Sequence, residues 1–310
     1  MPRRLTAAVA ALSLSLLALT ACGEDSGEAT TALDSVTIEA EAGKAPEVTW
    51  DGKLEPEKTE TKVLVTGDGE KTAEGDNVLT HIWLGNGFTQ EQSFSSYDSG
   101  SPELLTIGDN LTKGIRASIE GFPVGSVVAA AVPAEDAFGE AGNSTLGIGN
   151  GDSVLFVMEL VEIVPNEPQG TEQTPAAWAP ALVEEDGLIT GFDFTDTPKP
   201  TGKLQVTNLI EGDGAVVEEG QTIYVNYLGQ VYKAKAPFDD SYSRGVPAGF
   251  AIGVGQVVKG WDEALVGQTV GSRVVMAIPP KLGYGAEGNA DAGIKGTDTL
   301  FFVVDILAAD

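Results

Sequence analysis

The stretch VKGWDEAL, residues 258–265, decides the fold of this chain, because it places one short helix inside a sequence that otherwise alternates as β-strands do. Trp261 and Leu265 lie four positions apart, and therefore on one face of a helix. An aspartate and a glutamate follow the tryptophan in the first turn, where the helix dipole favours anions. Gly267 suits the end of the helix. The pattern predicts a short helix that presses a tryptophan onto a sheet.

Strands with one buried face are predicted on both sides of this helix. In residues 222–227 apolar side chains alternate with polar ones, and the same period of two returns in residues 274–278 and 300–306. The 39 glycines of the 310 residues favour turn-rich β structure. A short helix packed on a curved antiparallel sheet is an α+β arrangement.

The helix has an earlier counterpart, TKGIRASI, at residues 112–119. Other blocks also return at an offset of 144 to 146 residues, among them LVTGDG as LIEGDG, HIWLG as VNYLG and GIGNGDSVLFVMEL as GIKGTDTLFFVVDI. So long a period is typical of a duplicated domain rather than of a solenoid. We expect two domains, an N-terminal copy at residues 46–165 and a C-terminal copy at residues 198–310.

The segment between the copies, residues 166–197, is predicted to be a linker. It is rich in proline at its start and shows no apolar periodicity there. The piece LITGFDFTDTPKP, residues 188–200, leads into the C-terminal copy and is expected to pack on either domain.

The beginning of the chain has the pattern of a bacterial lipoprotein signal peptide. Residues 1–21 carry two arginines followed by an apolar run that is shorter than a membrane span. The small residues before Cys22 resemble a lipobox, so Cys22 is the predicted lipidation site, and residues 22–45 have the composition of a flexible spacer. The alternative is a chance cysteine in an uncleaved anchor. We expect a lipid-anchored protein on the extracytoplasmic face of the cell membrane.

Composition excludes several classes of function. Against 46 acidic residues there are 18 basic ones, a net charge of −28, and nucleic-acid binding needs basic patches that this chain lacks. One histidine, His81, and one cysteine are too few for a zinc, haem or Cys/His catalytic site. We therefore expect no cofactor, no metal and no nucleic-acid partner.

The C-terminal copy resembles the FKBP-type peptidyl-prolyl cis-trans isomerases. The resemblance rests on VNYLG, PFDDSYSRG, FAIGVGQVVKGWDEAL, GYGAEG and GIKGTDTLFFVVDIL in this order, and it covers residues 203–310. It implies an antiparallel sheet half-wrapped around one helix, with an aromatic pocket between them. Relatives often carry a histidine at the place of Asn289 and an aromatic residue at the place of Ala248, and these departures concern substrate preference and macrolide affinity.

The resemblance also implies roles for particular residues. The implied catalytic residues are Tyr227, Phe238, Asp239, Trp261, Tyr284 and Phe302. The implied substrate-binding residues are Arg244, Phe250, Val257, Val258 and Ile294. Trp261 would form the floor of the pocket, Val258 would offer its backbone N–H and Tyr284 its hydroxyl, and Tyr227 and Arg244 would hold Asp239 towards the substrate carbonyl.

The implied reaction needs neither a nucleophile nor a metal. Rotation about an X–Pro bond crosses a barrier of about 18–20 kcal/mol because it breaks amide resonance. An apolar pocket that removes water from the amide disfavours the charge-separated planar form. Proline-containing unfolded or flexible polypeptides are the expected partners, with a macrolide as a further ligand. The alternative is a client-binding or adhesion lipoprotein that uses the same scaffold without catalysis.

The N-terminal copy departs further from the family pattern. Alignment of the blocks puts Trp83 at the position of Tyr227, Ser95 at that of Asp239, Ile115 at that of Trp261 and Phe138 at that of Tyr284. The residues that support the fold persist and the polar pocket groups do not. We expect this copy to isomerise poorly or not at all, and to serve either as a structural spacer or as a groove that holds clients.

Overall fold

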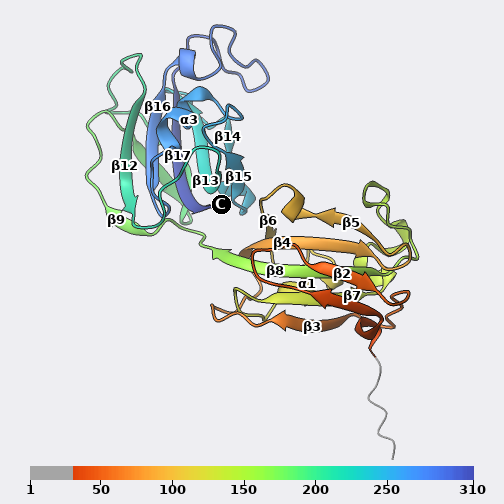
Figure 1. Cartoon of the computed structure of the whole chain (residues 1–310). Coiled ribbons are helices and arrows are strands. Elements are labelled where there is room, and N and C mark those ends of the chain that lie inside the picture. The colour runs from red at the N-terminus through yellow and green to blue at the C-terminus, as the bar shows by residue number, and fades with distance from the viewer. Residues whose placement is uncertain (1–30) are drawn as a thin grey trace, which may run out of the picture. The chain divides into compact units, whose positions relative to one another are not determined.

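The computed structural model describes residues 31–310. Within them each copy forms an antiparallel sheet with a helix on one face (Figure 1), which confirms the prediction of two α+β domains. The signal peptide, Cys22 and the first part of the predicted spacer lie outside the described residues. In the part of the chain that is described, no helix is both long and apolar enough to cross a membrane.

The sheet of the N-terminal copy runs in the order β3-β7-β8-β4-β5, with β6 also paired to β4. Its strands are β3 (Glu60–Val65), β4 (Asn77–Asn86), β5 (Glu91–Ser95), β6 (Glu103–Thr106), β7 (Val127–Val132) and β8 (Val154–Val164). Its helices are α1 (Lys113–Ile119), α2 (Ala134–Ala137) and the 3-10 turns Ser96–Asp98, Gly139–Ala141 and Ser144–Leu146.

The sheet of the C-terminal copy runs in the order β14-β13-β17-β16-β12-β9, with β15 also paired to β13. Its strands are β9 (Gly170–Glu172), β12 (Gln205–Gly212), β13 (Thr222–Val231), β14 (Asp239–Asp240), β15 (Ala248–Ala251), β16 (Arg273–Ile278) and β17 (Leu300–Ala309). Its helix is α3 (Lys259–Leu265), accompanied by the 3-10 turns Tyr242–Arg244 and Pro280–Leu282.

A glycine in each helix lets it lie close to its sheet. A Cβ added at Gly260 would come within 2.5 Å of a methyl carbon of Ile278, and one added at Gly114 within 2.4 Å of a methyl carbon of Val132. No side chain fits at these distances. The Lys-Gly pair that both copies share is therefore explained by its glycine, which sets how near the helix approaches the strand.

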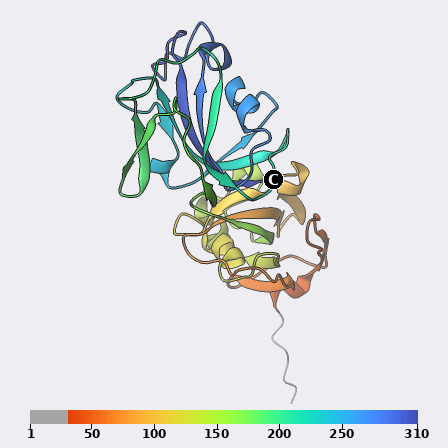
Figure 2. The same cartoon turned by 90° about the vertical axis from the view of Figure 1, so that its left-hand side faces the viewer.

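The outer face of each sheet, away from the helix, is covered by a two-stranded hairpin. In the C-terminal copy this is the hairpin of β10 (Ala181–Glu185) and β11 (Leu188–Asp193), which Figure 2 shows in green on the side of the sheet opposite α3. Ile189, Phe192 and Phe194 pack with Phe301 and Val303 of the sheet in one buried cluster. The residues predicted to form a linker therefore include this cover, and β9 (Gly170–Glu172), which extends the sheet at β12.

The N-terminal copy has the same cover. The 3-10 turn η1 (Ala32–Ser35) and the hairpin of β1 (Val36–Glu39) and β2 (Glu47–Trp50) pack on Trp83, Val127 and Leu155 of its outer face. Residues 31–45, predicted to belong to a flexible spacer, thus contain η1 and β1. Because β1 starts at Val36 and β10 at Ala181, 145 residues later, the hairpin belongs to the repeated unit.

Candidate functional site

A cavity of about 500 Å³ opens between α3 and the sheet of the C-terminal copy. Its walls come from strands β13, β14, β15 and β17, from the loop that precedes α3, and from the loop that contains Tyr284. The lining residues are Tyr227, Phe238, Asp239, Phe250, Gln256, Val257, Val258, Lys259, Trp261, Gly283, Tyr284 and Phe302. The size and the aromatic lining are typical of a small-ligand site.

Trp261 lies at the centre of the apolar part of this cavity. Its side chain is buried, and Tyr227, Phe250 and Phe302 meet it edge-on, with ring centroids 5.5, 5.2 and 5.3 Å away. Phe238 packs edge-on against Phe302 in turn, at 5.6 Å. Edge-to-face packing holds aromatic rings in fixed orientations. The cavity is therefore a rigid box with an indole as its floor.

The polar side of the cavity is a triangle of three side chains. The Tyr227 hydroxyl donates to Asp239 Oδ2 at 2.5 Å, while Arg244 donates to Asp239 Oδ1 at 3.1 Å and to the Tyr227 hydroxyl at 3.2 Å. Burial, and then the hydrogen bond to Asp239, raise the pKa of Tyr227 to about 12, so the phenol keeps its proton at neutral pH. Asp239 and Arg244 are half exposed, so their ion pair orients Asp239 more than it stabilises the fold.

One glycine of the strand leaves room for the box. A Cβ added at Gly229 would lie 2.6 Å from ring carbons of both Phe238 and Phe302. Any side chain at this position would push these two rings apart or into the cavity. The site therefore requires a glycine at position 229. The sequence did not indicate this requirement, because a Leu-Gly pair occurs in both copies.

The structure brings together most of the residues implied by the resemblance. Nine of the eleven line the cavity. Arg244 is adjacent to it through its bonds to Tyr227 and Asp239, whereas Ile294 is buried in the core beneath. The cavity is also lined by Gln256, Lys259 and Gly283, which the sequence did not indicate.

In the N-terminal copy the strand register corrects two of the matched positions. Val157 of β8 pairs with Trp83, Phe156 pairs with Leu84, and Phe302 of β17 pairs with Gly229. Phe156 and Phe302 are equivalent in the repeat, so Leu84 takes the place of Gly229. Trp83 therefore corresponds to Leu228 and faces the outer cluster, and Ile82 stands at the position of Tyr227.

The position of the pocket carboxylate is corrected in the same way. Asp239 pairs with Gly229 and Phe94 pairs with Leu84, so Phe94, not Ser95, occupies the position of Asp239. Phe94 and Leu84 both pack on the inner core of this copy. A match of the two Leu-Gly pairs is wrong by one residue, and a shift of one residue exchanges the two faces of a strand.

The two remaining matched positions keep their alignment. Ile115 is the third residue of α1, as Trp261 is of α3, and Phe138 follows α2 at the place of Tyr284. Both pack on the inner core. With Leu84 and Phe94, they put four apolar side chains at positions where the C-terminal copy has an indole, a phenol, a glycine and a carboxylate.

Comparison with known proteins agrees with this description. The family model of the FKBP-type peptidyl-prolyl cis-trans isomerase matches the chain twice, at residues 69–161 and 214–307. The chain is similar to an FK506-binding protein of Streptomyces anulatus, 40% identical over 110 residues, which are 36% of this chain and 89% of that protein. It is also similar to FK506-binding protein 2 of Dictyostelium discoideum, 40% identical over 111 residues, which are 35% of this chain and 82% of that protein.

Among solved structures, the chain is similar to the crystal structure of AtFKBP13. The identity is 31% and the TM-score 0.33, with 36% of this chain and 95% of that chain covered.

Proposed function

The chain belongs to the family of FKBP-type peptidyl-prolyl cis-trans isomerases, and from this premise we propose that its C-terminal copy carries the isomerase site and acts on X–Pro bonds of secreted or surface polypeptides. The observation that carries the proposal is the aromatic box around Trp261, closed on its polar side by Tyr227, Asp239 and Arg244. A macrolide is a further ligand that this apolar box suits.

The box can lower the barrier to rotation in two ways. When a proline ring packs flat on Trp261, the ring and the amide that precedes it are both removed from contact with water. The planar amide is charge-separated by resonance, and water stabilises this form by solvating it. Removal of water therefore favours the twisted form, in which the charge separation is lost. The walls formed by Tyr227, Phe238 and Phe302 then hold the twisted geometry more tightly than the planar one.

Polar groups at the edge of the box can orient the substrate. Tyr284 lines the cavity and is 37% exposed, so its hydroxyl is available to donate to a substrate carbonyl. Asp239 keeps its carboxylate towards the cavity because Tyr227 and Arg244 each hold one of its oxygens. We assign these groups to binding and orientation, since no bond of the substrate is broken.

We further propose that the N-terminal copy does not isomerise X–Pro bonds. Leu84 stands where Gly229 leaves room, and Phe94 stands where Asp239 offers its carboxylate. Ile115 keeps the inner core filled but provides no flat ring for proline.

A peptide isomerisation assay tests both proposals on the purified protein. We expect the wild type to accelerate a Leu-Pro test peptide and Trp261→Ala to lose at least about 90% of kcat/KM, equivalent to more than about 1.4 kcal/mol. The matched control is Ile115→Ala in the N-terminal copy, which should leave the rate unchanged. A wild type without activity that still binds unfolded polypeptide would instead favour the client-binding alternative.

Activity left in Trp261→Ala and lost with Ile115→Ala would overturn the assignment of the two copies.

We also propose that the protein is anchored by lipid at Cys22 on the extracytoplasmic face of the cell membrane, on the basis of the signal sequence and lipobox pattern. Replacing Cys22 by alanine should release the protein from the membrane fraction or leave it unprocessed. Unchanged membrane attachment of this variant would contradict lipidation.

A further inference from the structure

The loop between β15 and α3 forms one wall of the cavity. It starts at the fully buried Ile252, and its last three residues, Gln256, Val257 and Val258, line the cavity. Between these two ends lie Gly253 and Gly255, with φ values of +83° and +78°, and the 51% exposed Val254. The left-handed backbone of the glycines is strained for other residues, so this loop needs them to make its turn.

A single carboxylate on α3 holds this turn. Asp262 accepts a hydrogen bond from Gly253 N at Oδ1, at 2.7 Å, and one from Gly255 N at Oδ2, at 3.0 Å. Hydrogen bonds from backbone N–H groups to a carboxylate are roughly twice as strong as neutral ones. Asp262 therefore contacts both arms of the turn at once, and its role exceeds the favourable helix-dipole position that the sequence indicated.

Asp262 directly follows Trp261 in the chain, so it connects the floor of the cavity to the wall. Its own side chain is not among those that line the cavity. On the basis of the proposed isomerase function, we propose that Asp262 is a positioning residue. Its two bonds fix the distance between Trp261 and the wall formed by Val257 and Val258.

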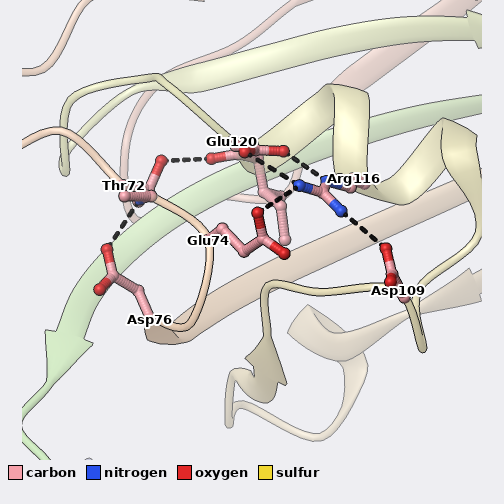
Figure 3. Close-up of polar contacts among 8 residues, drawn as sticks. Thr72, Glu74, Asp76, Asp109, Arg116 and Glu120 are labelled. Atoms are coloured by element: carbon pink, nitrogen blue, oxygen red, sulfur yellow. Dashed lines mark hydrogen bonds and ion pairs between the residues drawn. The ribbon is translucent and has the colours of Figure 1, made fainter.

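The N-terminal copy uses a different connection at the same place. Arg116 occupies the position of Asp262, and Figure 3 shows its guanidinium reaching Asp109, Glu74 and Glu120. In the loop that precedes α1, the carboxylate of Asp109 accepts a hydrogen bond from Arg116 Nη1 at 3.2 Å. In the N-terminal copy, therefore, the helix is connected to the loop by a contact between two side chains. In the C-terminal copy it is connected by a side chain that accepts from backbone N–H groups.

The start of the helix differs accordingly. In the N-terminal copy the Thr112 hydroxyl accepts from Ile115 N at 3.4 Å and caps α1. The equivalent residue in the C-terminal copy is Val258, which has no hydroxyl to offer and lines the cavity instead. The carboxylate that accepts from the loop backbone, Asp262, thus occurs in the copy whose loop lines a cavity.

The test compares Asp262→Ala with Glu263→Ala in the whole protein. Glu263 is the next carboxylate on the same helix and makes only an exposed ion pair with Lys259 at 3.4 Å. We expect Asp262→Ala to lower kcat/KM at least about fivefold, mainly through a higher KM, because the wall loses its fixed place. Glu263→Ala should keep both constants.

Amide hydrogen exchange gives a readout that does not depend on activity. In Asp262→Ala the N–H groups of Gly253 and Gly255 should exchange faster, while they stay as in the wild type in Glu263→Ala. Asp262→Asn keeps one acceptor oxygen and should fall between, and it serves in place of Asp262→Ala if the latter does not fold.

Wild-type KM in a folded Asp262→Ala or Asp262→Asn protein, or equal losses in Glu263→Ala, would overturn the positioning role. A wild type without isomerase activity would refute the proposed function instead, and the exchange of the two glycine amides would then decide whether Asp262 holds the loop.

Discussion

Leu84 and Gly229 occupy the same position in the two sheets, one paired with Phe156 and the other with Phe302. In the C-terminal copy the absence of a side chain lets the rings of Phe238 and Phe302, which both line the cavity, pack against the strand. In the N-terminal copy the leucine is buried in the inner core. One position on a central strand thus differs in the way expected for its copy. It is a glycine in the copy that has the cavity and a buried leucine in the other copy.

Gly229→Ala should reduce kcat/KM at least about tenfold, because the new methyl group would meet both phenylalanine rings at 2.6 Å. Overpacking of this kind also costs about 1–3 kcal/mol of unfolding free energy. The control is Gly249→Ala on β15, where the nearest side-chain atom, of Tyr224, is 3.3 Å from the added carbon. Peptide assays and urea titrations on both variants check this, and full activity in Gly229→Ala would contradict it.

Tyr227→Phe should lower kcat/KM by about tenfold while the aromatic box stays in place. The variant removes the hydroxyl that donates to Asp239 and accepts from Arg244, and a hydrogen bond to a charged group is worth about 1.5–3 kcal/mol. Tyr232→Phe is a matched control, since its hydroxyl contacts only the Thr197 carbonyl on the far side of the sheet. Equal rates for the two variants in the peptide assay would remove the polar triangle from the mechanism.

Phe192→Ala should destabilise the protein without reducing its activity. The Phe192 ring is buried in the outer cluster, at 6.2 Å from the ring of Phe301, whereas the cavity lies on the other face of the sheet. Loss of such a ring costs about 3 kcal/mol. Thr190→Ala, an exposed neighbour on β11, should change the unfolding free energy by less than about 0.5 kcal/mol. Urea titration followed by an assay of the folded fraction separates the two effects.

Stability should fall at alkaline pH. Burial raises the pKa of Tyr227 to about 12, while an unfolded tyrosine loses its proton near pH 10. A raised pKa in the folded state means that this contribution is fully present below pH 10 and is lost as the pH rises from 10 towards 12. Unfolding titrations at pH 8, 10 and 11 should show the decrease, and Tyr227→Phe should show a shallower one.

The fold could be predicted from the sequence because its main elements carry strong local patterns. Alternation with a period of two marked the strands, and Trp261 and Leu265 on one face marked the helix. The cavity residues came from the family resemblance, and nine of the eleven line the cavity as implied.

The sequence could not give the register of β4. A bulge between Leu79 and Thr80 and another between Leu84 and Gly85 shift the pairing, and the shared Leu-Gly pair drew the alignment one residue away from the true match. Such a slip turns Trp83 from the outer cluster towards the cavity. Only the hydrogen-bonded partners of the strand decide between the two.

The covering hairpins were missed for a different reason. In β11 and directly after it, the buried Ile189, Phe192 and Phe194 are spaced irregularly and lie among glycine, aspartate and threonine, which are typical of turns. The role of Asp262 was hidden as well, because its partners are backbone N–H groups that leave no trace in the sequence.

The hairpin that precedes each sheet has a consequence for how this chain arose. A duplication of the sheet and its helix alone would have given a second domain with an exposed apolar outer face, and such a face favours aggregation. Because β1 and β10 stand at the same point of the repeat, the repeated unit includes the hairpin that covers its own sheet. Each copy thus has a covered outer face of its own, so the inner faces can differ in the phenol, the carboxylate and the indole while both copies keep their fold.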